Sequence, residues 1–297
     1  MTRPPGPRVA VIVTCFDSGA TLDEAVSSVR HEPIELVIVD DGSTERATLE
    51  LLSVLEHEGL RVLHQPNRGF SAALMTGVEA TSSPYVFPLG GDDIVEPGAL
   101  SRLADALDAN SGAAVAWGDL QTFGLTSFLV PSAPSLDPWL VTFANLVPSS
   151  SLFRRTALLD VGGWTLTGGG YEDWDVLMSL AERGHTGVYV PGVVYRYRRN
   201  TQGLLATSLG RFDEHYEELR RRHPRLFAER RRSRRNSRAP RSLKLLLPLT
   251  DAAPGLGRLG KVQLAQLLTH LLWNGGIRAT IPIVRQGIAL RSRRFRR

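Results

Sequence analysis

Cysteine is nearly absent from this chain of 297 residues, which contains only Cys15. A single thiol cannot form an intramolecular disulfide, and it excludes a structural zinc site built from cysteines. We therefore expect a reducing, cytoplasmic location. Long apolar runs are also absent, since none reaches the roughly 18 residues that a membrane-spanning helix needs. The first apolar run, Val9 to Val13, is too short for the core of a signal peptide and predicts a strand.

Positive charge is scarce in the first 210 residues, and negative charge is scarce in the rest. Residues 1–210 carry 13 Arg against 24 Asp and Glu, whereas residues 211–297 carry 22 Lys and Arg against 6 acids. The net charge of +5 therefore hides an acidic first part and a basic second part. With 42% hydrophobic residues, the chain is long enough for one α/β domain and an appendage. We expect a domain over 1–210 and a basic, helical extension over 211–297.

Short β-branched runs alternate with helical patterns through the first hundred residues. Strands are expected at 9–13, 36–39, 60–63 and 85–89. Helices are expected between them, the second over about 45–57 and the third over about 71–80. Because strands that alternate with helices imply right-handed crossovers, the fold class is α/β with a mainly parallel sheet.

The first two helical segments have recognisable faces. Thr21 to Glu24 has the spacing of a capping box at the start of the first helix. The residues expected on its inward face are Leu22, Ala25, Val26 and Val29. The residues expected to face the core from the second helix are Leu51, Val54 and Leu55.

Two pairs of acids follow predicted strands. Asp40 and Asp41 end the second strand, and Asp92 and Asp93 follow Gly90 and Gly91 after the fourth. In open α/β sheets, ligands bind beyond the carboxyl ends of the strands, so both pairs stand where a site is expected. The alternatives are that one of Asp40 and Asp41 caps the following helix and that Asp92 and Asp93 are surface turn residues.

Eight short motifs follow one another over residues 8–205. They are VIVTCFDSG at 11–19, VDDGST at 39–44, NRGFSAA at 67–73, LGGDD at 89–93, SLFRR at 151–155, VGGW at 161–164, YEDWD at 171–175, and VP at 190–191 leading to YRYR at 195–198. Each is weak alone, but their order and spacing resemble family 2 glycosyltransferases. The resemblance implies a GT-A, Rossmann-like sheet flanked by helices, and a nucleotide-diphosphate sugar as donor.

The resemblance assigns the donor to the strand ends. Carboxylates accept hydrogen bonds from a uracil-type N–H and from ribose hydroxyls, and an aromatic ring offers a face to the base. The nucleotide-sugar contacts expected on this basis are Thr14, Phe16, Asp40, Asp41, Gly69, Gly91 and Asp92.

The resemblance also implies a divalent metal, Mg or Mn, that neutralises the diphosphate leaving group. Asp92 and Asp93 are the expected metal ligands. The chain departs from the family's Asp-x-Asp pattern because Gly90 replaces the first acid. Two further departures are Leu74-Met75, where an arginine is usual, and Arg198 to Thr201, where many relatives have a histidine. Either water and diphosphate fill the metal shell, or Arg198 or Arg199 shares the role of the metal.

Asp173 is the expected general base of an inverting transfer, and Glu172 is the second choice. A carboxylate takes the proton of the acceptor hydroxyl as its oxygen attacks the anomeric carbon. Residues 168–170 form a glycine loop before the two acids, and the residues after them have helical spacing. The acids therefore lie at a helix N-terminus, where the dipole is expected to lower their basicity, and the alternative is that they are capping residues. Trp164 either lines the acceptor side or packs in the core.

The basic extension has three recognisable parts. Residues 212–227 are predicted to be helical, and the arginine run 230–238 is predicted to be a linker or a solvated face. A further helix carries an apolar stripe of Leu264, Leu267, Leu268, Leu271 and Leu272, and an arginine-studded segment, 277–297, follows. Amphipathic helices with clustered arginines suit an anionic membrane surface. Packing on the catalytic domain or homodimerisation is the alternative, and nothing in the basic runs indicates nucleic acid.

These observations predict an inverting, metal-assisted transferase of single sugars, since the QxxRW signature of processive synthases is absent. The expected acceptor is a glycan or glycolipid at the inner face of the cell membrane, in polysaccharide biosynthesis. The alternative from another class is a weak or inactive GT-A protein that binds nucleotide sugars and acts as a membrane-associated partner. A sugar-phosphate nucleotidyltransferase is disfavoured because residues 14–21 contain no basic side chain.

Overall fold

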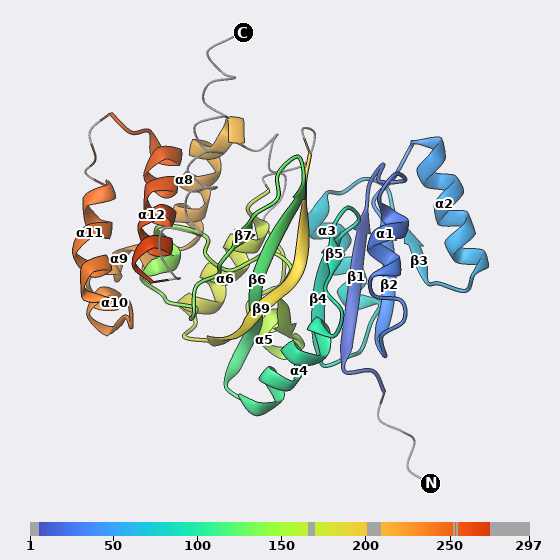
Figure 1. The fold of residues 1–297 in the computed structure, drawn as a ribbon, viewed down its shortest axis with the longest axis horizontal. Coiled ribbons are helices and arrows are strands. Elements are labelled where there is room, and N and C mark those ends of the chain that lie inside the picture. The colour runs from blue at the N-terminus through green and yellow to red at the C-terminus, as the bar shows by residue number, and fades with distance from the viewer. Residues whose placement is uncertain (1–5, 166–169, 201–208, 252, 254, 274–297) are drawn as a thin grey trace.

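The computed structural model describes residues 6–165, 170–200, 209–251, 253 and 255–273. Its centre is a nine-stranded sheet in the order β3-β2-β1-β4-β8-β6-β9-β5, with β7 beside β6 (Figure 1). The expectations for the glycines at 168–169 and for the arginine-studded segment beyond 273 lie outside the described residues.

The first half of the sheet is parallel, as the alternating pattern predicts. It consists of β1 (Val9–Cys15), β2 (Glu35–Asp40), β3 (Val62–His64) and β4 (Tyr85–Gly90). Every residue of β1 is buried, which is why this strand is a continuous apolar run rather than an alternating one. The helices α1 (Leu22–Ser27), α2 (Arg46–His57) and α3 (Phe70–Glu79) connect these strands.

Two details of these helices differ from the prediction. Val54 is 52% exposed, and the buried face of α2 is Thr48, Leu52 and Leu55 instead. These three are spaced by four and three residues, which is one helical face that does not include Val54. Thr21 makes no capping hydrogen bond; its hydroxyl donates to the carbonyl of Gly91 over 2.8 Å. The inward face of α1 is as predicted, with Leu22, Ala25, Val26 and Val29 fully buried.

The second half of the sheet is mixed. β8 (Leu152–Arg154) runs antiparallel to both β4 and β6 (Ala113–Gly124), whereas β6 and β9 (Thr186–Arg199) are parallel. The short strands β5 (Ile94–Val95) and β7 (Leu129–Val130) complete it. The helices here are α4 (Ala99–Ala109), α5 (Arg155–Asp160), α6 (Glu172–Glu182) and the short η1 (Leu140–Thr142). The apolar spacing of α6 is confirmed, because Trp174, Val176, Leu177, Leu180 and Ala181 are all buried.

The C-terminal region is helical, as predicted, and it packs against α6 and the loop that carries η1 (Figure 1). After η2 (Leu209–Arg211) come α8 (Phe212–Arg222), α9 (Pro224–Ala228), α10 (Arg230–Asn236), α11 (Arg241–Asp251) and α12 (Arg258–Leu272). The predicted helix over 212–227 is divided at Pro224, which begins a new helix because it has no N–H to donate.

Two expectations about this region change. Of the two alternatives for the arginine run, the linker is wrong: residues 230–236 form a helix with no buried residue, as a solvated face would, and Arg230 lies 3.9 Å from the ring centre of Phe143. The predicted leucine stripe is not the buried face of α12, which consists of Gly260, Val262, Ala265, Thr269 and His270. Leu219, Leu243, Leu247 and Val262 belong to the same hydrophobic cluster as Trp174 and Leu177. The charge division near residue 210 therefore coincides with the start of the helical region but not with a break in the core.

Candidate active site

Three parallel strands end together at the site that the sequence predicts. Cys15 of β1 pairs with Asp40 of β2, and Thr14 pairs with Gly90 of β4. The N–H of Asp41 donates to the carbonyl of Cys15 over 2.8 Å, and the N–H of Gly91 donates to that of Thr14 over 2.9 Å. Both acid pairs therefore stand at one edge of the sheet.

Asp41 is buried and holds the loop that follows β3. Its carboxylate accepts hydrogen bonds from the N–H groups of Arg68 and Gly69, at 2.9 and 2.8 Å, and from Nε2 of Gln65 at 2.7 Å. Gly69 has a φ of 88°, which favours glycine, and it precedes the first residue of α3. Asp41 thus fixes the loop 65–69 beside the strand ends.

Asp40 is also buried, and neither it nor Asp41 caps α2. Asp40 accepts the N–H of Ser43 at 3.0 Å and Nδ1–H of His64 at 2.9 Å, and this bond raises the pKa of His64. The residue that accepts N–H groups at the start of α2 is Asp17, whose Oδ1 lies 2.7 Å from the nitrogen of Thr44 and 2.8 Å from that of Glu45. The sequence analysis assigned no role to Asp17. The feature that could have indicated one is a short polar side chain in a turn, since such residues tolerate the left-handed conformation that Asp17 adopts, with a φ of 47°.

The rim of this edge offers one aromatic face. Phe16, next to Asp17, is 50% exposed, which fits its predicted contact with a base. Gly91 is required by packing, because a Cβ there would lie 2.9 Å from the carbonyl oxygen of Thr14. Thr14 itself is buried, and its carbonyl oxygen already accepts the hydrogen bond from the N–H of Gly91.

Asp92 and Asp93 stand between β4 and β5, and β5 pairs with the end of β9. Asp93 is buried, and its Oδ1 accepts the N–H of Arg198 at 2.9 Å. Burial raises the pKa of Asp92, and burial together with the charge of Asp92 raises that of Asp93 well above its usual range. The guanidinium of Arg198 donates from Nε to the carbonyl of Asp92 at 2.9 Å and pairs with Glu24. Arg198 therefore lies against the acid pair, at the position where a histidine was expected.

The acid pair fits a divalent cation as a two-carboxylate site. Within the described ranges, no group of three or more His, Cys, Asp or Glu is arranged to hold a metal. Mg²⁺ is commonly held by one or two carboxylates with water and phosphate oxygens completing its shell. A Cβ at Gly90 would lie 3.0 Å from Oδ1 of Asp92 and 3.4 Å from Oδ2 of Asp93, so the acid missing at 90 would have joined the same cluster.

Asp173 lies in the first turn of α6; the residue keeps some exposed surface, but its carboxylate is desolvated. Its Oδ2 accepts a hydrogen bond from Nδ2 of Asn145 at 2.6 Å. Burial and then the charge of Glu172 raise the pKa of Asp173 to about 7. The backbone N–H groups at the helix N-terminus lower the pKa of Asp173, as expected, but desolvation outweighs them. The side chain of Glu172 is buried, which makes Asp173 the more accessible of the two.

Two tyrosines of β9 connect the acid pair with Asp173. Burial and the charge of Asp93 raise the pKa of both Tyr195 and Tyr197, and the charge of Asp173 contributes to both shifts. The two carboxylates therefore act electrostatically on the same two tyrosines. Sequence reasoning used these tyrosines only as part of a motif. Trp164 is a core residue, 3% exposed and packed edge to face on Phe153.

A glycine motif in the C-terminal region lies outside this site and lacks the structural context of a nucleotide-binding loop. Gly255, Gly257 and Gly260 have the spacing G-x-G-x-x-G of dinucleotide-binding loops. They lie between the end of α11 and the first turn of α12, whereas that motif requires a strand before the glycines. The pattern therefore indicates no nucleotide site.

The comparisons with known proteins agree with this geometry. The family model described as Glycosyl transferase family 2 matches residues 10–158, half of the chain. The uncharacterized glycosyltransferase EpsJ of Bacillus subtilis (strain 168) is 29% identical over 108 residues, which are 35% of this chain and 31% of the relative. The poly-beta-1,6-N-acetyl-D-glucosamine synthase of Staphylococcus aureus (strain COL) is 25% identical over 201 residues, 62% of this chain and 48% of the relative. The chain spans about a third to a half of the length of these two relatives.

Solved structures agree on the fold. The crystal structure of S. aureus TarS 1-349 in complex with UDP-GlcNAc aligns with 90% of this chain and 73% of its own, with a TM-score of 0.55 and 15% identity. The corresponding complex with UDP has a TM-score of 0.54 and 17% identity, over 89% of this chain and 72% of that one. The match of half the sequence to the family model and the shared architecture lead to one conclusion: the chain is a member of glycosyl transferase family 2 with the GT-A fold.

Proposed function

We propose that this protein is an inverting glycosyltransferase that moves a single sugar from a nucleotide diphosphate to a hydroxyl of a glycan or lipid-linked acceptor. The observation that carries the proposal is the position of Asp173. Its carboxylate has a pKa of about 7 and shares Tyr195 and Tyr197 with the acid pair at the end of β4. A base with a pKa near the working pH is suited to take a proton from a hydroxyl.

The donor lies along the edge formed by β1, β2 and β4. The exposed ring of Phe16 stacks on the base. The carboxylate of Asp41 has three protein donors, which leaves one of its roughly four acceptor positions for an N–H of the base or a ribose hydroxyl. Asp40, Thr14, Gly69 and Gly91 shape the floor of this edge. Because the TarS structures contain UDP-GlcNAc and UDP, uridine-diphosphate sugars are the first donors to test.

Asp92 and Asp93 hold the divalent metal, Mg or Mn. When bound, the metal neutralises charge on the diphosphate as it leaves. Arg198 fixes the two acids through the carbonyl of Asp92 and the carboxylate of Asp93. With this support the acids need no third protein ligand.

Asp173 accepts the proton of the acceptor hydroxyl as that oxygen forms the bond to the anomeric carbon and the bond to the diphosphate breaks. A single displacement inverts the anomeric configuration and needs one base. Glu172 is the alternative base, and its burial makes it the weaker candidate.

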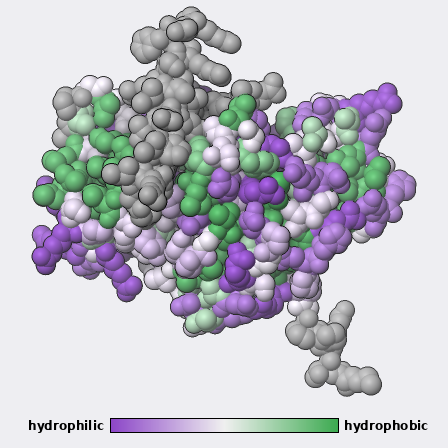
Figure 2. Space-filling view, viewed as in Figure 1, coloured by the Kyte–Doolittle hydropathy of each residue, from purple (hydrophilic) through white to green (hydrophobic). Residues whose placement is uncertain are grey.

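The C-terminal helices carry a surface suited to an anionic membrane. Leu245 and Leu249 of α11 are 66% and 60% exposed, and α10 beside them is rich in arginine. Figure 2 shows hydrophobic and hydrophilic surface side by side at the end of the molecule where Figure 1 has α10 to α12. No described helix is long and apolar enough to cross a membrane. We infer peripheral binding at the inner face of the cell membrane, in the cytoplasm, where lipid-linked acceptors are found.

Vesicle flotation tests this surface. The double variant Leu245→Glu and Leu249→Glu is expected to lose binding to vesicles that contain phosphatidylglycerol, because charged residues replace the inserted leucines. The matched control is Val54→Glu, which places the same charge on an exposed residue of α2 at the far end of the molecule. Equal binding by all three proteins contradicts the proposal. A halved mass of the double variant in light scattering would assign the leucines to a homodimer.

The function is tested by binding and then by turnover. Nucleotide sugars are screened with Mg²⁺ or Mn²⁺ for protection against thermal unfolding, since a ligand that binds only the folded state raises its stability. Release of the nucleoside diphosphate from the protective donor is then measured with and without glycan acceptors. Binding without release under any condition would favour a donor-binding protein without catalytic activity.

A further inference from the structure

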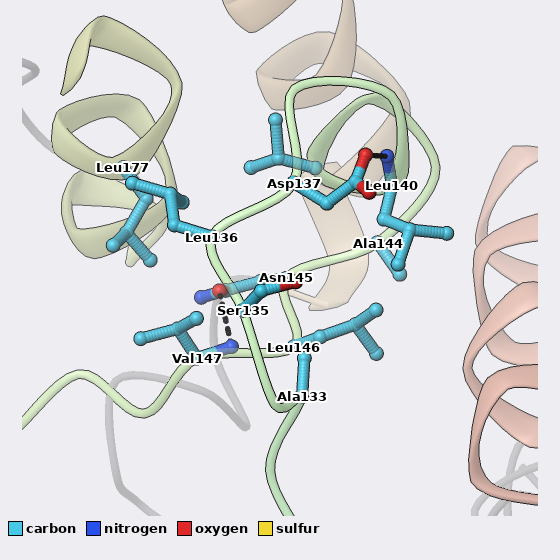
Figure 3. Close-up of a pocket in the computed structure, with 11 residues that line it drawn as sticks. Ala133, Ser135, Leu136, Asp137, Leu140, Ala144, Asn145, Leu146, Val147 and Leu177 are labelled. Atoms are coloured by element: carbon cyan, nitrogen blue, oxygen red, sulfur yellow. Dashed lines mark hydrogen bonds between the residues drawn. The ribbon is translucent and has the colours of Figure 1, made fainter. Parts of the chain in front are cut away.

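Asn145 touches the carboxylate of Asp173 from a distant part of the chain. It lies after η1 and before β8, 28 positions before Asp173, and its Nδ2 is 2.6 Å from Oδ2 of Asp173. Its own side-chain oxygen accepts the N–H of Val147 at 3.4 Å, which sets the orientation of the amide (Figure 3). The amide therefore directs its N–H group toward Asp173 and its oxygen toward its own loop.

The loop that carries Asn145 is attached to the C-terminal helices. Gln266 of α12 donates to the carbonyl of Asn145 at 3.3 Å. Tyr216 of α8 and Arg230 of α10 donate to the carbonyl and hydroxyl of Thr142, at 3.0 and 2.7 Å. Ser237 donates to Asp137 at 2.6 Å. These four contacts come from α8, α12, and α10 with its C-cap residue Ser237, and they hold residues 137–145.

The same loop is also attached to the catalytic helix. Trp174, which follows Asp173, donates from its indole N–H to the carbonyl of Val141 at 2.7 Å. Leu177 of α6 packs with Leu136, Leu140 and Val141 around the small, mainly apolar hollow that Asn145 borders (Figure 3). These contacts fix the loop 137–145 against α6. The short distance between Asn145 and Asp173 is therefore supported by the packing of the two segments as well as by the hydrogen bond itself.

One hydrogen bond to a carboxylate has two chemical consequences. It stabilises the ionised form, and the contact with Asn145 opposes the burial that raises the pKa of Asp173. It also restricts the rotation of the carboxylate, since Oδ2 is held by the amide while the backbone N–H groups of Asp173 and Trp174 contact the same carboxylate.

We propose that Asn145 is a positioning residue, which holds Oδ2 of Asp173 and thereby directs Oδ1 toward the acceptor hydroxyl. The inference rests on the proposed role of Asp173 as the base. It assigns the C-terminal helices a part in the reaction, because they hold the loop from which Asn145 reaches the base.

The test measures the titration of Asp173 directly in the full chain. Aspartate carboxyl groups labelled with ¹³C are followed by NMR against pH, and Asp173→Asn identifies the resonance. Asn145→Leu is expected to raise the midpoint of Asp173 by about one pH unit or more, because a hydrogen bond to the charged form is lost. Asn145→Ala also lacks the N–H donor and adds no charge beside Asp173, so it is expected to raise the midpoint as well.

The second readout is release of UDP from UDP-GlcNAc with Mg²⁺ in a single turnover. Asn145→Leu is expected to lower the rate by about 100-fold, as a misplaced reacting group does, with affinity for UDP unchanged. The control is Asn110→Leu, since the side-chain amide of Asn110 donates to the carbonyl of Ala106 at the end of α4, and its other contacts are made by its backbone. It is expected to change neither the midpoint nor the rate.

The possible failures are distinguishable. An unmoved midpoint of Asp173 in both Asn145 variants overturns the positioning role, whatever happens to the rate. If Asp173→Asn keeps full turnover, the base is elsewhere and the proposed function fails, even where the midpoint moves. If Asn145→Leu does not fold, the uncharged Asn145→Ala decides the question by the same titration.

Discussion

The two ends of this site are built in different ways. At the donor edge, the acids are held by groups close to them in the sheet: Asp41 by the loop 65–69, and Asp40 by Ser43 and His64. At the base, Asp173 is held by Asn145, whose loop is in turn held by residues between 216 and 266. The donor edge follows from strand register, whereas the base depends on packing between distant segments.

The difference has an electrostatic counterpart. Asp17 at the donor edge accepts backbone N–H groups, which lower its pKa. Burial dominates at Asp93 and Asp173 and raises the pKa of both. A base that takes a proton near neutral pH benefits from a raised pKa, so desolvation suits Asp173 to its proposed role.

The largest expected effect comes from Asp173→Asn, which should impair the base and leave the donor edge intact. Asp173→Asn is expected to lower sugar transfer by about 1000-fold, within the range of general base catalysis, because the amide cannot take a proton. Affinity for the donor, measured by calorimetry, should stay within about twofold if the donor edge is independent of the base. Retained transfer would assign the base to Glu172, and Glu172→Gln would then test it.

The pH dependence of stability sharpens the same comparison. The folded state keeps a proton on Asp173 up to about pH 7, whereas the unfolded chain releases it near its ordinary pKa of 3.8. The free energy of unfolding therefore falls as pH rises between these values, by about 4 kcal/mol at most. Urea unfolding at pH 5 and pH 8 measures the fall, and Asp173→Asn should abolish it.

Asp17 should have the opposite pH dependence, because its pKa is lowered in the fold. Its ionised carboxylate stabilises the wild type at pH 7, and this stabilisation is lost as the pH falls to about 3. Asp17→Asn should therefore be less stable than the wild type at pH 7.

The dependence of the base end on the C-terminal helices is tested at Arg222. This residue of α8 donates two hydrogen bonds, at 2.7 and 3.0 Å, to the buried carboxylate of Asp175 on α6. Arg222→Met leaves that carboxylate with His223 as partner and should cost about 2 kcal/mol, below the usual cost of a fully orphaned charge. Chemical denaturation measures it. A matched loss of an exposed pair, Arg46→Met on α2, should cost less than about 0.5 kcal/mol. Equal costs would contradict the proposed attachment.

The smallest effect concerns the metal. Asp92→Ala is expected to abolish the gain in donor affinity that Mg²⁺ or Mn²⁺ produces, which is about tenfold for one lost ligand. Calorimetry of UDP binding with and without metal measures it, and an unchanged metal response would remove Asp92 from the metal shell.

The prediction from sequence succeeded where structure is local and failed where it is not. The strand ends, the acid pairs and the inward faces of α1 and α6 follow from periodicity, because each is decided within a few residues. Val54 was misplaced because two apolar faces of α2 were compatible with the same residues, and only contact with the sheet selects one. A linker remained an alternative for 230–236, since nothing local shows that Arg230 stacks on Phe143.

The sequence by itself determined the α/β alternation, the family and the identity of the acids, because strand period, turn residues and motif order are properties of neighbouring residues. Only the tertiary structure decided which carboxylates are desolvated, that Arg198 supports the acid pair, and that Asn145 and the C-terminal helices hold Asp173. These contacts join residues up to about a hundred positions apart, such as Asp93 and Arg198. Burial and long-range pairing depend on the whole packed chain, so no local pattern contains them.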